Sequence, residues 1–257
     1  MSYNYLLTLL LIIIIISLYL NIHESFSNLV HLNSIVDKIY VINLKKDRYR
    51  LDILEPKLNK LNIKYEIING IDGETVVNHT KMRTGQYGCL LSHIKILKDA
   101  HKNRYNNIAI LEDDIIFNKQ FNHMFDKKYR YLLKKENEYD ILYLGSSQGY
   151  YHCKKKKWKD VKLNNHYYKV KDTLGTFAFI INKKIIKNIL DQFEQKPQPI
   201  DNLINEHIIK NPLYKCFALY PNIITANVSN ISNTSKKKRS QVYFMKLNNI
   251  NPKHFDM

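Results

Sequence analysis

The sequence contains few cysteines, with three among its 257 residues. Cys89, Cys153 and Cys216 do not make a disulfide framework, and separate buried thiols are favoured over a Cys153–Cys216 bridge. The sequence has no Cys/His spacing typical of a structural zinc site and no internal repeat. These absences exclude a disulfide-rich or repeat scaffold, and the length of the chain suits one domain with a substantial core.

Acidic residues are scarce relative to basic ones, 23 against 40, which gives a formal net charge of +17. Such an excess can serve nucleic acid, an anionic membrane surface or an acidic substrate. The basic residues are dispersed along the chain, with short runs at Lys154–Lys157 and Lys236–Arg239, and no nucleic-acid recognition motif occurs. We therefore assign the positive charge to solvated loops and predict no nucleic-acid partner.

Charge is absent from residues 3–22, which include Leu9-Leu10-Leu11 followed by Ile12–Ile16. This length is close to the roughly 20 residues that span a bilayer as a helix. The basic start of a signal peptide is missing, and Ser25-Phe26-Ser27 is a poor cleavage site, so an uncleaved anchor is favoured over a signal peptide. We predict a transmembrane anchor at 1–22, a stem at 23–37 and a single-pass membrane protein with a lumenal domain in a eukaryotic cell.

Hydrophobic periodicity predicts strands that alternate with helices. A buried strand is expected at Lys38–Leu44, a helix after Asp47 and a second strand at Ile63–Ile68. Ser92 is expected to cap a helix that runs to about Arg104, before a central strand at Asn107–Leu111. Further strands are predicted at 140–144, 175–181 and 214–220, with helices at 183–193 and from about 201 to 209. The pattern predicts an α/β fold with a mainly parallel sheet flanked by helices, in which ligands bind beyond the carboxyl ends of the strands.

The central strand leads directly into three adjacent carboxylates, Glu112-Asp113-Asp114. Three neighbouring negative charges repel one another and are best tolerated where a cation or solvent neutralises them. Oxygen ligands at a strand end suit Mg²⁺ or Mn²⁺, which commonly hold the diphosphate of a nucleotide. An acidic turn or helix start explains the triplet equally well when it is taken alone.

Several segments in this order resemble glycosyltransferase family 25, which includes bacterial lipopolysaccharide sugar transferases and animal collagen galactosyltransferases. Each segment is weak evidence alone, but together they are specific. They are Lys38-Ile39-Tyr40-Val41-Ile42-Asn43-Leu44 with Lys45-Lys46-Asp47-Arg48, then Gly70-Ile71-Asp72-Gly73, Gly88-Cys89-Leu90-Leu91-Ser92-His93, the acidic triplet, and Asp140-Ile141-Leu142-Tyr143-Leu144-Gly145. The resemblance implies a catalytic domain at 38–227 with a GT-A type nucleotide-sugar fold and a mixed sheet, followed by a polar tail at 228–257.

The resemblance also implies an activity: metal-dependent transfer of a sugar from a UDP-sugar, with inversion, and UDP-galactose is the expected donor. Asp114 is the first candidate metal ligand, Glu112 contacts the Mn²⁺ or Mg²⁺ or the ribose, and Asp113 is a substrate-binding residue of ambiguous role. The acceptor is expected to be a glycan, a lipid-linked glycan or a protein hydroxyl. The alternative is a catalytically inactive relative that acts as an anchored recognition module.

The remaining candidate residues match the family segments one by one. Asn43 and Arg48 are predicted to contact the nucleotide, with a solvated helix-start charge as the alternative for Arg48. Asp72 and Gly73 form a turn in which Asp72 has either a structural or a ligand role.

Ser92 and His93 are assigned to the donor pocket, at a helix start whose free backbone donors favour anions. A structural role is the alternative for His93. Asp201 matches the family's Pro-Val-Asp and is the candidate for acceptor activation, with capping of the next helix as the alternative.

Overall fold

The computed structural model describes residues 7–17, 29–147, 164–229, 232–233, 238–248 and 250–256. Its centre is a seven-stranded sheet with the strand order β2-β1-β3-β7-β5-β8-β6. The strands β2, β1 and β3 run parallel to one another, as do β5 and β8, whereas β7 and β6 are antiparallel to their neighbours. Their bounds are β1 Lys38–Asn43, β2 Glu66–Asn69, β3 Asn107–Glu112, β5 Ile141–Tyr143, β6 Tyr167–Lys169, β7 Ala178–Asn182 and β8 Cys216–Leu219.

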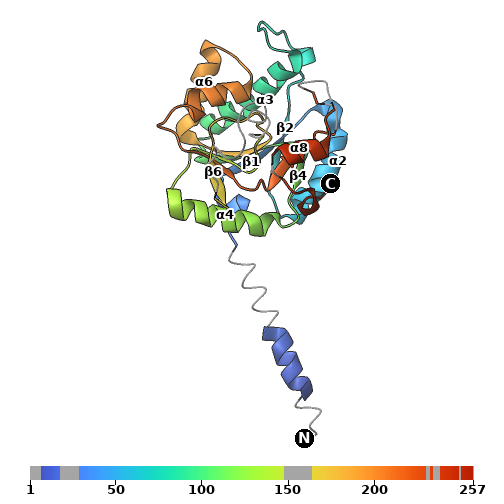
Figure 1. The fold of residues 1–257 in the computed structure, drawn as a ribbon. Helices are drawn as coiled ribbons and strands as arrows, with labels where there is room; N and C mark the ends of the chain where they lie inside the picture. Colours follow the sequence, from blue (N-terminus) through green and yellow to red (C-terminus); the bar gives the residue numbers. More distant parts are fainter. Residues whose placement is uncertain are drawn as a thin grey trace.

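Helices cover both faces of this sheet (Figure 1). Because side chains alternate across a strand, Ile39 and Val41 face one layer while Tyr40 faces the other. The first layer is formed by α2 (Arg48–Lys60) and α4 (Phe121–Glu136). The second is formed by α3 (Thr84–Lys102), α6 (Lys183–Gln195), α7 (Ile200–Ile204) and the π-helix η5 (Asn205–Ile209). Short 3₁₀ turns are η1 (Leu32–Ser34), η2 (Lys45–Asp47), η3 (Gly73–Thr75) and η6 (Pro252–His254).

A small second sheet lies next to the end of β3. It pairs β4 (Ile115–Phe117) with β9 (Ile224–Ala226) in antiparallel register. The helix α8 (Gln241–Leu247) follows, and its Met245 packs with Ile116, Ile250 and Phe255 in a separate apolar cluster. The described part of the predicted polar tail therefore packs against the domain, although its sequence shows no convincing periodicity.

The predicted α/β class is confirmed, with a largely parallel central sheet between two helical layers. The start of the helix after the Gly70–Gly73 turn is corrected. It begins at Thr84 rather than at Ser92, and its first turn is closed by the Gln86 side chain, which accepts from the Arg83 backbone N–H. Ser92 and His93 consequently lie in the interior of α3, where no free backbone donors are available for an anion.

The predicted membrane anchor at 1–22 is also corrected. Within the described residues no helix is both long and apolar enough to cross a membrane, so the expectation of a single-pass membrane protein is contradicted. The helical stretch at 7–17 is shorter than the roughly 20 residues that a span requires. The rest of the predicted anchor, 1–6 and 18–22, lies outside the described residues. In the predicted stem, Leu32 is buried in the core and the Val30 backbone N–H donates to Asp126.

Candidate active site

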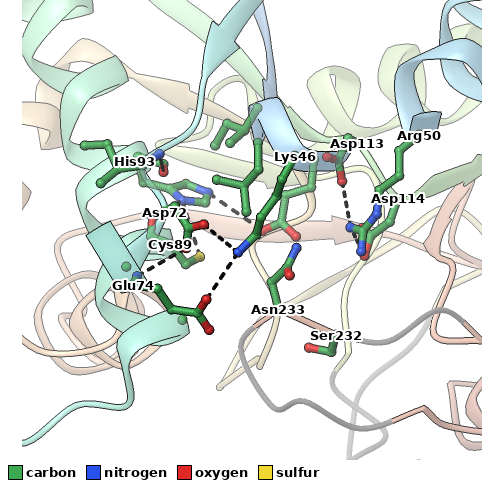
Figure 2. A pocket seen from close by; sticks show the side chains of 17 residues that line it. Lys46, Arg50, Asp72, Glu74, Cys89, His93, Asp113, Asp114, Ser232 and Asn233 are labelled. Carbon is green, nitrogen blue, oxygen red and sulfur yellow. Dashed lines mark hydrogen bonds and ion pairs between the residues drawn. The ribbon is translucent and has the colours of Figure 1, made fainter. Parts of the chain in front are cut away.

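A pocket opens where β1 and β3 end, between these strands and the first half of α3 (Figure 2). All three residues of the acidic triplet line it. The other charged and polar side chains around it come from η2, α2, the Asp72–Glu74 turn and α3, and they are Lys46, Arg50, Asp72, Glu74, Cys89, Ser92 and His93, with Ser232 and Asn233 from the C-terminal region. The site therefore lies at the carboxyl ends of parallel strands, as the alternating pattern predicts.

Asp113 is held by two buried partners. Its Oδ1 accepts from Arg50 Nη1 at 3.0 Å, and its Oδ2 accepts from Asn43 Nδ2 at 2.6 Å. Asn43 is itself buried at the end of β1 and also donates to the Asp47 carbonyl. Burial raises the pKa of Asp113, while the Arg50 charge and the hydrogen bonds from Arg50 and Asn43 oppose that rise. Both carboxylate oxygens of Asp113 are thus occupied by protein donors.

Asp114 has a different environment. Its Oδ2 lies 3.8 Å from Arg50 Nη1, whereas its buried Oδ1 has no hydrogen-bond partner among the described residues. Burial and the neighbouring Asp113 charge raise the pKa of Asp114. A buried carboxylate oxygen without a donor is costly unless a bound group satisfies it.

Glu112 ends β3 and is half-buried between two cavities. Its Oε1 accepts a long hydrogen bond of 3.5 Å from Thr176 Oγ1 and lies 4.0 Å from His93 Nε2. Burial raises the pKa of Glu112, and the charges of Asp114, Asp113 and Asp201 raise it further. The negative potential around Glu112 favours a proton or a cation at this point.

Ser92 and His93 connect α3 to the floor of the pocket. Ser92 Oγ accepts from the Ile71 backbone N–H at 2.8 Å and donates to the Gly88 carbonyl at 2.7 Å, which ties the Asp-Gly turn to α3. His93 is 1% exposed, and its Nδ1 lies 2.9 Å from the Cys89 carbonyl. Burial lowers the pKa of His93, which favours the neutral form of its imidazole.

Gly73 permits the closest backbone approach in the pocket. A Cβ on Gly73 would lie 1.8 Å from the Thr84 carbonyl oxygen, and a Cβ on Gly88 would lie 2.5 Å from the Gly73 nitrogen. The turn therefore packs directly onto the start of α3. Asp72 caps η3 by accepting from the Glu74 backbone N–H and forms a 2.5 Å ion pair with Lys46. Lys46 also lies 3.7 Å from Glu74, so the rim carries one cation between two carboxylates.

Arg48 does not line the pocket. It lies at the start of α2, is largely exposed and pairs with Glu55 at 3.6 Å. Arg50, which the sequence analysis did not single out, is the arginine at the acidic triplet. Helical periodicity could have indicated that Arg50 is buried, because Arg50 shares the buried face of α2 with Leu51, Leu54 and Leu58. The nucleotide role of Arg48 stays a prediction.

Asp201 lines an adjacent cavity together with Gln86, Thr176 and Glu112. It is the second residue of α7, whose N-cap is Pro199, so Asp201 does not occupy the capping position considered for it. Its Oδ1 accepts from the Asn202 backbone N–H at 2.9 Å. Burial raises the pKa of Asp201. Glu112 lines both cavities, so the fold brings Asp201 close to the triplet.

The residues present fit a divalent cation of the Mn²⁺ or Mg²⁺ type. Asp114 offers an oxygen that has no hydrogen-bond partner within the described part of the chain, and Glu112 offers a carboxylate at the pocket wall. Asp113 is less suited, because Arg50 and Asn43 occupy its oxygens. Carboxylate oxygens are the ligands that these hard cations prefer.

Comparison with known proteins identifies the family. The model of glycosyltransferase family 25, described as an LPS biosynthesis protein family, matches residues 36–204. This match covers more than half of the chain, which therefore belongs to glycosyltransferase family 25.

The similar proteins differ in how much of their length is matched. Procollagen galactosyltransferase 2 of Mus musculus is 24% identical over 129 residues, which is 42% of this chain and 20% of that protein. The chain thus covers about a fifth of the length of this relative. A glycosyltransferase of Haemophilus influenzae is 25% identical over 201 residues, 72% of this chain and 68% of that protein.

The family also contains proteins named as inactive. One from Mus musculus, inactive glycosyltransferase 25 family member 3, is 23% identical over 132 residues, 44% of this chain and 22% of that protein. Among solved structures, a glycosyltransferase involved in glycosylation of the major capsid of PBCV-1 is 8% identical with a TM-score of 0.39, covering 72% of this chain and 92% of that chain.

Proposed function

We propose that this chain is a metal-dependent glycosyltransferase that moves a sugar from a UDP-sugar to a hydroxyl group, with UDP-galactose as the first donor to test. Membership of glycosyltransferase family 25 and the name of the procollagen galactosyltransferase relative support the reaction class and the sugar. The observation that carries the proposal is Asp114, whose buried Oδ1 has no hydrogen-bond partner among the described residues and whose side chain lines the pocket.

Within the acidic triplet, one carboxylate is held by protein donors and two are available to bind a cation. Arg50 and Asn43 hold Asp113, which orients the strand end and leaves the Asp114 and Glu112 carboxylates for Mn²⁺ or Mg²⁺. A cation bound there neutralises negative charge that develops on the leaving diphosphate. A cation held by Asp114 and Glu112 would attract the negatively charged diphosphate of the donor, and Lys46 and Asp72 line the same pocket.

Asp201 is the proposed base for the acceptor hydroxyl. Its cavity adjoins the donor pocket at Glu112, so an acceptor there can approach a sugar held by the triplet. In an inverting transfer the hydroxyl oxygen attacks the anomeric carbon, the bond from that carbon to the diphosphate oxygen breaks, and the hydroxyl proton passes to Asp201. Burial raises the pKa of Asp201, which makes it a better proton acceptor than an ordinary aspartate. A glycan, a lipid-linked glycan or a protein hydroxyl can supply the acceptor.

Calorimetric titration tests the donor site. UDP, UDP-galactose and UDP-glucose are titrated into the full chain with Mn²⁺ and with a chelator. Mn²⁺-dependent binding is expected in the wild type and is expected to be lost in Asp114→Asn. The matched control is Asp191→Asn, because Asp191 lies on α6, pairs with Lys187 and is outside the pocket. Absence of binding in the folded wild type contradicts the proposal.

A catalytically inactive relative that recognises a glycan is the second candidate. Family members named as inactive match this chain at nearly the same identity as the named galactosyltransferase, 23% against 24%. Release of UDP from UDP-galactose distinguishes the two functions. Mn²⁺-dependent nucleotide binding without any transfer or slow hydrolysis favours the recognition module, whereas UDP release that requires Asp114 favours the enzyme.

A further inference from the structure

The pocket contains a second set of metal-binding side chains with a different chemistry from the Asp114 carboxylate. Cys89 and His93 lie one helical turn apart on α3 (Figure 2). Glu112 is the last residue of β3. One ligand atom from each residue lies within 4.8 Å of the other two. Cys89 Sγ is 3.8 Å from His93 Nδ1, and His93 Nε2 is 4.0 Å from Glu112 Oε1.

We propose that Cys89, His93 and Glu112 bind a divalent cation of the zinc class, at a site distinct from the Asp114 position proposed for Mn²⁺ or Mg²⁺. Thiolate, imidazole and carboxylate are the three protein ligands that Zn²⁺ uses. Metal–ligand bonds of about 2.0–2.3 Å place neighbouring ligand atoms roughly 3.3–3.6 Å apart in a tetrahedral site. The ligand atoms lie farther apart than this, 4.0 Å between His93 Nε2 and Glu112 Oε1 and no more than 4.8 Å within the set, so the half-buried Cys89 and Glu112 side chains must move inward when the cation binds. All three residues line the pocket.

The hydrogen bonding of His93 fits this assignment. A metal-binding histidine usually donates its other ring N–H to a carbonyl or carboxylate, which fixes the tautomer. Nδ1 of His93 lies 2.9 Å from the Cys89 carbonyl, whereas Nε2 is 3.4 Å from the Thr176 carbonyl. We assign the ring proton to Nδ1, because Nδ1 makes the shorter contact with a carbonyl oxygen. Nε2 is then the nitrogen available to a cation, and it lies 4.0 Å from Glu112 Oε1.

The negative charges of the neighbouring carboxylates also favour a cation next to Glu112. Asp114 and Asp201 both add negative potential at this carboxylate. Among the described residues no lysine or arginine pairs with Glu112, and His93 Nε2 lies 4.0 Å from its Oε1. A divalent cation between His93 and Glu112 would balance this potential, and Cys89 would bind it as thiolate after loss of a proton.

Ligand softness separates this site from the neighbouring carboxylate site. Oxygen-only ligands at Asp114 suit Mn²⁺ and Mg²⁺, whereas a sulfur ligand selects cations such as Zn²⁺ and Co²⁺. The zinc-class site therefore requires neither a nucleotide nor glycosyl transfer, and it does not rest on the proposed function. Glu112 is common to both donor sets, so occupancy of one site should change the affinity of the other.

Cobalt absorption spectroscopy tests the proposal on the full chain. Co²⁺ bound by a cysteine thiolate gives a near-ultraviolet charge-transfer band, whereas Co²⁺ bound by oxygen ligands does not. The band is expected to appear in the reduced wild type, to saturate at equimolar Co²⁺ and to disappear when Zn²⁺ is added. Cys89→Ser is expected to abolish it. Glu112→Gln, which keeps the side-chain shape, is expected to weaken Co²⁺ binding by at least about tenfold.

Two further cysteines provide matched controls. Cys216→Ser alters a buried free thiol on β8, away from the pocket, and Cys153→Ser alters the third cysteine of the sequence. Both variants should keep the band. Absence of the band in folded wild type, its persistence in Cys89→Ser or its loss in Cys216→Ser or Cys153→Ser overturns the proposal. Far-ultraviolet circular dichroism checks the fold of each variant.

Asp114→Asn distinguishes failure of this proposal from failure of the proposed function. This variant should retain the cobalt–thiolate band although it loses Mn²⁺-dependent UDP binding. Loss of the band in Asp114→Asn contradicts a distinct site. A wild type that binds UDP with Mn²⁺ but shows no cobalt–thiolate band overturns the zinc-class site and leaves the glycosyltransferase proposal standing.

Discussion

Arg50 and Asp113 form a buried ion pair, with 3.0 Å between Arg50 Nη1 and Asp113 Oδ1. The same nitrogen lies 3.8 Å from Asp114 Oδ2, so one guanidinium serves two adjacent carboxylates. Asn43 occupies the second oxygen of Asp113. Both carboxylate oxygens of Asp113 therefore bind protein donors, whereas an oxygen of Asp114 is left for a ligand. This difference explains how three consecutive acidic residues can have different roles.

Removal of the Arg50 charge should destabilise the fold strongly. Arg50→Met leaves Asp113 buried without its cation, and breaking a buried pair in this way costs about 3–5 kcal/mol. Arg48→Met is the matched control, because Arg48 is an exposed arginine on the same helix, and it should change the free energy of unfolding by less than about 0.5 kcal/mol. Urea denaturation measures both values. Equal effects of the two substitutions would contradict the structural role assigned to Arg50.

The acidic site should make stability depend on pH. The pKa values of Glu112, Asp113, Asp114 and Asp201 are all raised, mainly by burial, so the folded protein holds these protons more tightly than the unfolded chain. Their favourable contribution is therefore complete below the ordinary carboxyl pKa values and is lost as the pH rises through the raised values. Above that range the metal-free site opposes folding.

Asp114→Asn should consequently stabilise the metal-free protein at pH 8 and have little effect near pH 4. An increase of about 1 kcal/mol corresponds to a Tm rise of about 2–4 °C for a domain of this size. Thermal unfolding in a chelator at both pH values measures it. Added Mn²⁺ should raise the Tm of the wild type at pH 8 but not that of the variant. The control is Asp191→Asn, which should lack this gain in Tm because Asp191 lies outside the pocket and pairs with Lys187.

The sequence was sufficient to predict the strands that position the site. Continuous apolar runs identified β1 and β3, and the alternation of strands with helices placed the acidic triplet at a ligand-binding sheet edge. The antiparallel β7 between β3 and β5 could not be derived, because strand direction depends on long-range pairing rather than on local pattern. The family resemblance implied a mixed sheet but did not identify the antiparallel strand.

The details of the site depended on contacts that local sequence does not encode. Arg48 and Arg50 differ by two positions, and only the orientation of α2 against the sheet decides which one is buried. Serine is a common helix cap, which led to the prediction that the helix starts at Ser92. The close approach of Gly73 to Thr84 allows α3 to begin at Thr84, two turns earlier. The proximity of Asp201 to Glu112 likewise arises from packing between segments far apart in the chain.

The approach of Gly73 to α3 should be intolerant of any side chain. Gly73→Ala would place a Cβ 1.8 Å from the Thr84 carbonyl oxygen, which requires movement of backbone at the pocket wall. We expect a loss of about 2–4 kcal/mol of stability, in the range of severe steric substitutions. At Gly70 the nearest atoms are side-chain carbons of Leu44 and Ile42 at 3.1 and 3.2 Å, so Gly70→Ala should cost less. Urea denaturation compares the two, and a Gly73→Ala protein as stable as Gly70→Ala would contradict this packing.

Replacement of Asp201 should separate chemistry from donor binding. If Asp201 accepts the proton of the acceptor hydroxyl, Asp201→Asn should lower kcat by about 10²–10⁴-fold, the usual contribution of a general base. Mn²⁺-dependent UDP binding should be nearly unchanged, because Asp201 lines the neighbouring cavity and not the donor pocket. Activity of the wild type should fall on the acid side, as Asp201 becomes protonated, and its raised pKa places this limb at a higher pH than an ordinary aspartate would.

The control for Asp201 is Glu206→Gln, an exposed carboxylate on η5 that hydrogen-bonds with Gln198 and lines neither cavity. Its kcat and acid limb should match those of the wild type. Steady-state kinetics with UDP-galactose, measured as UDP release in the presence of an acceptor, provide both parameters. An Asp201→Asn enzyme with wild-type kcat and an unchanged acid limb would exclude Asp201 as the base. Glu112, the other carboxylate with a raised pKa at this cavity, would then be the next residue to test.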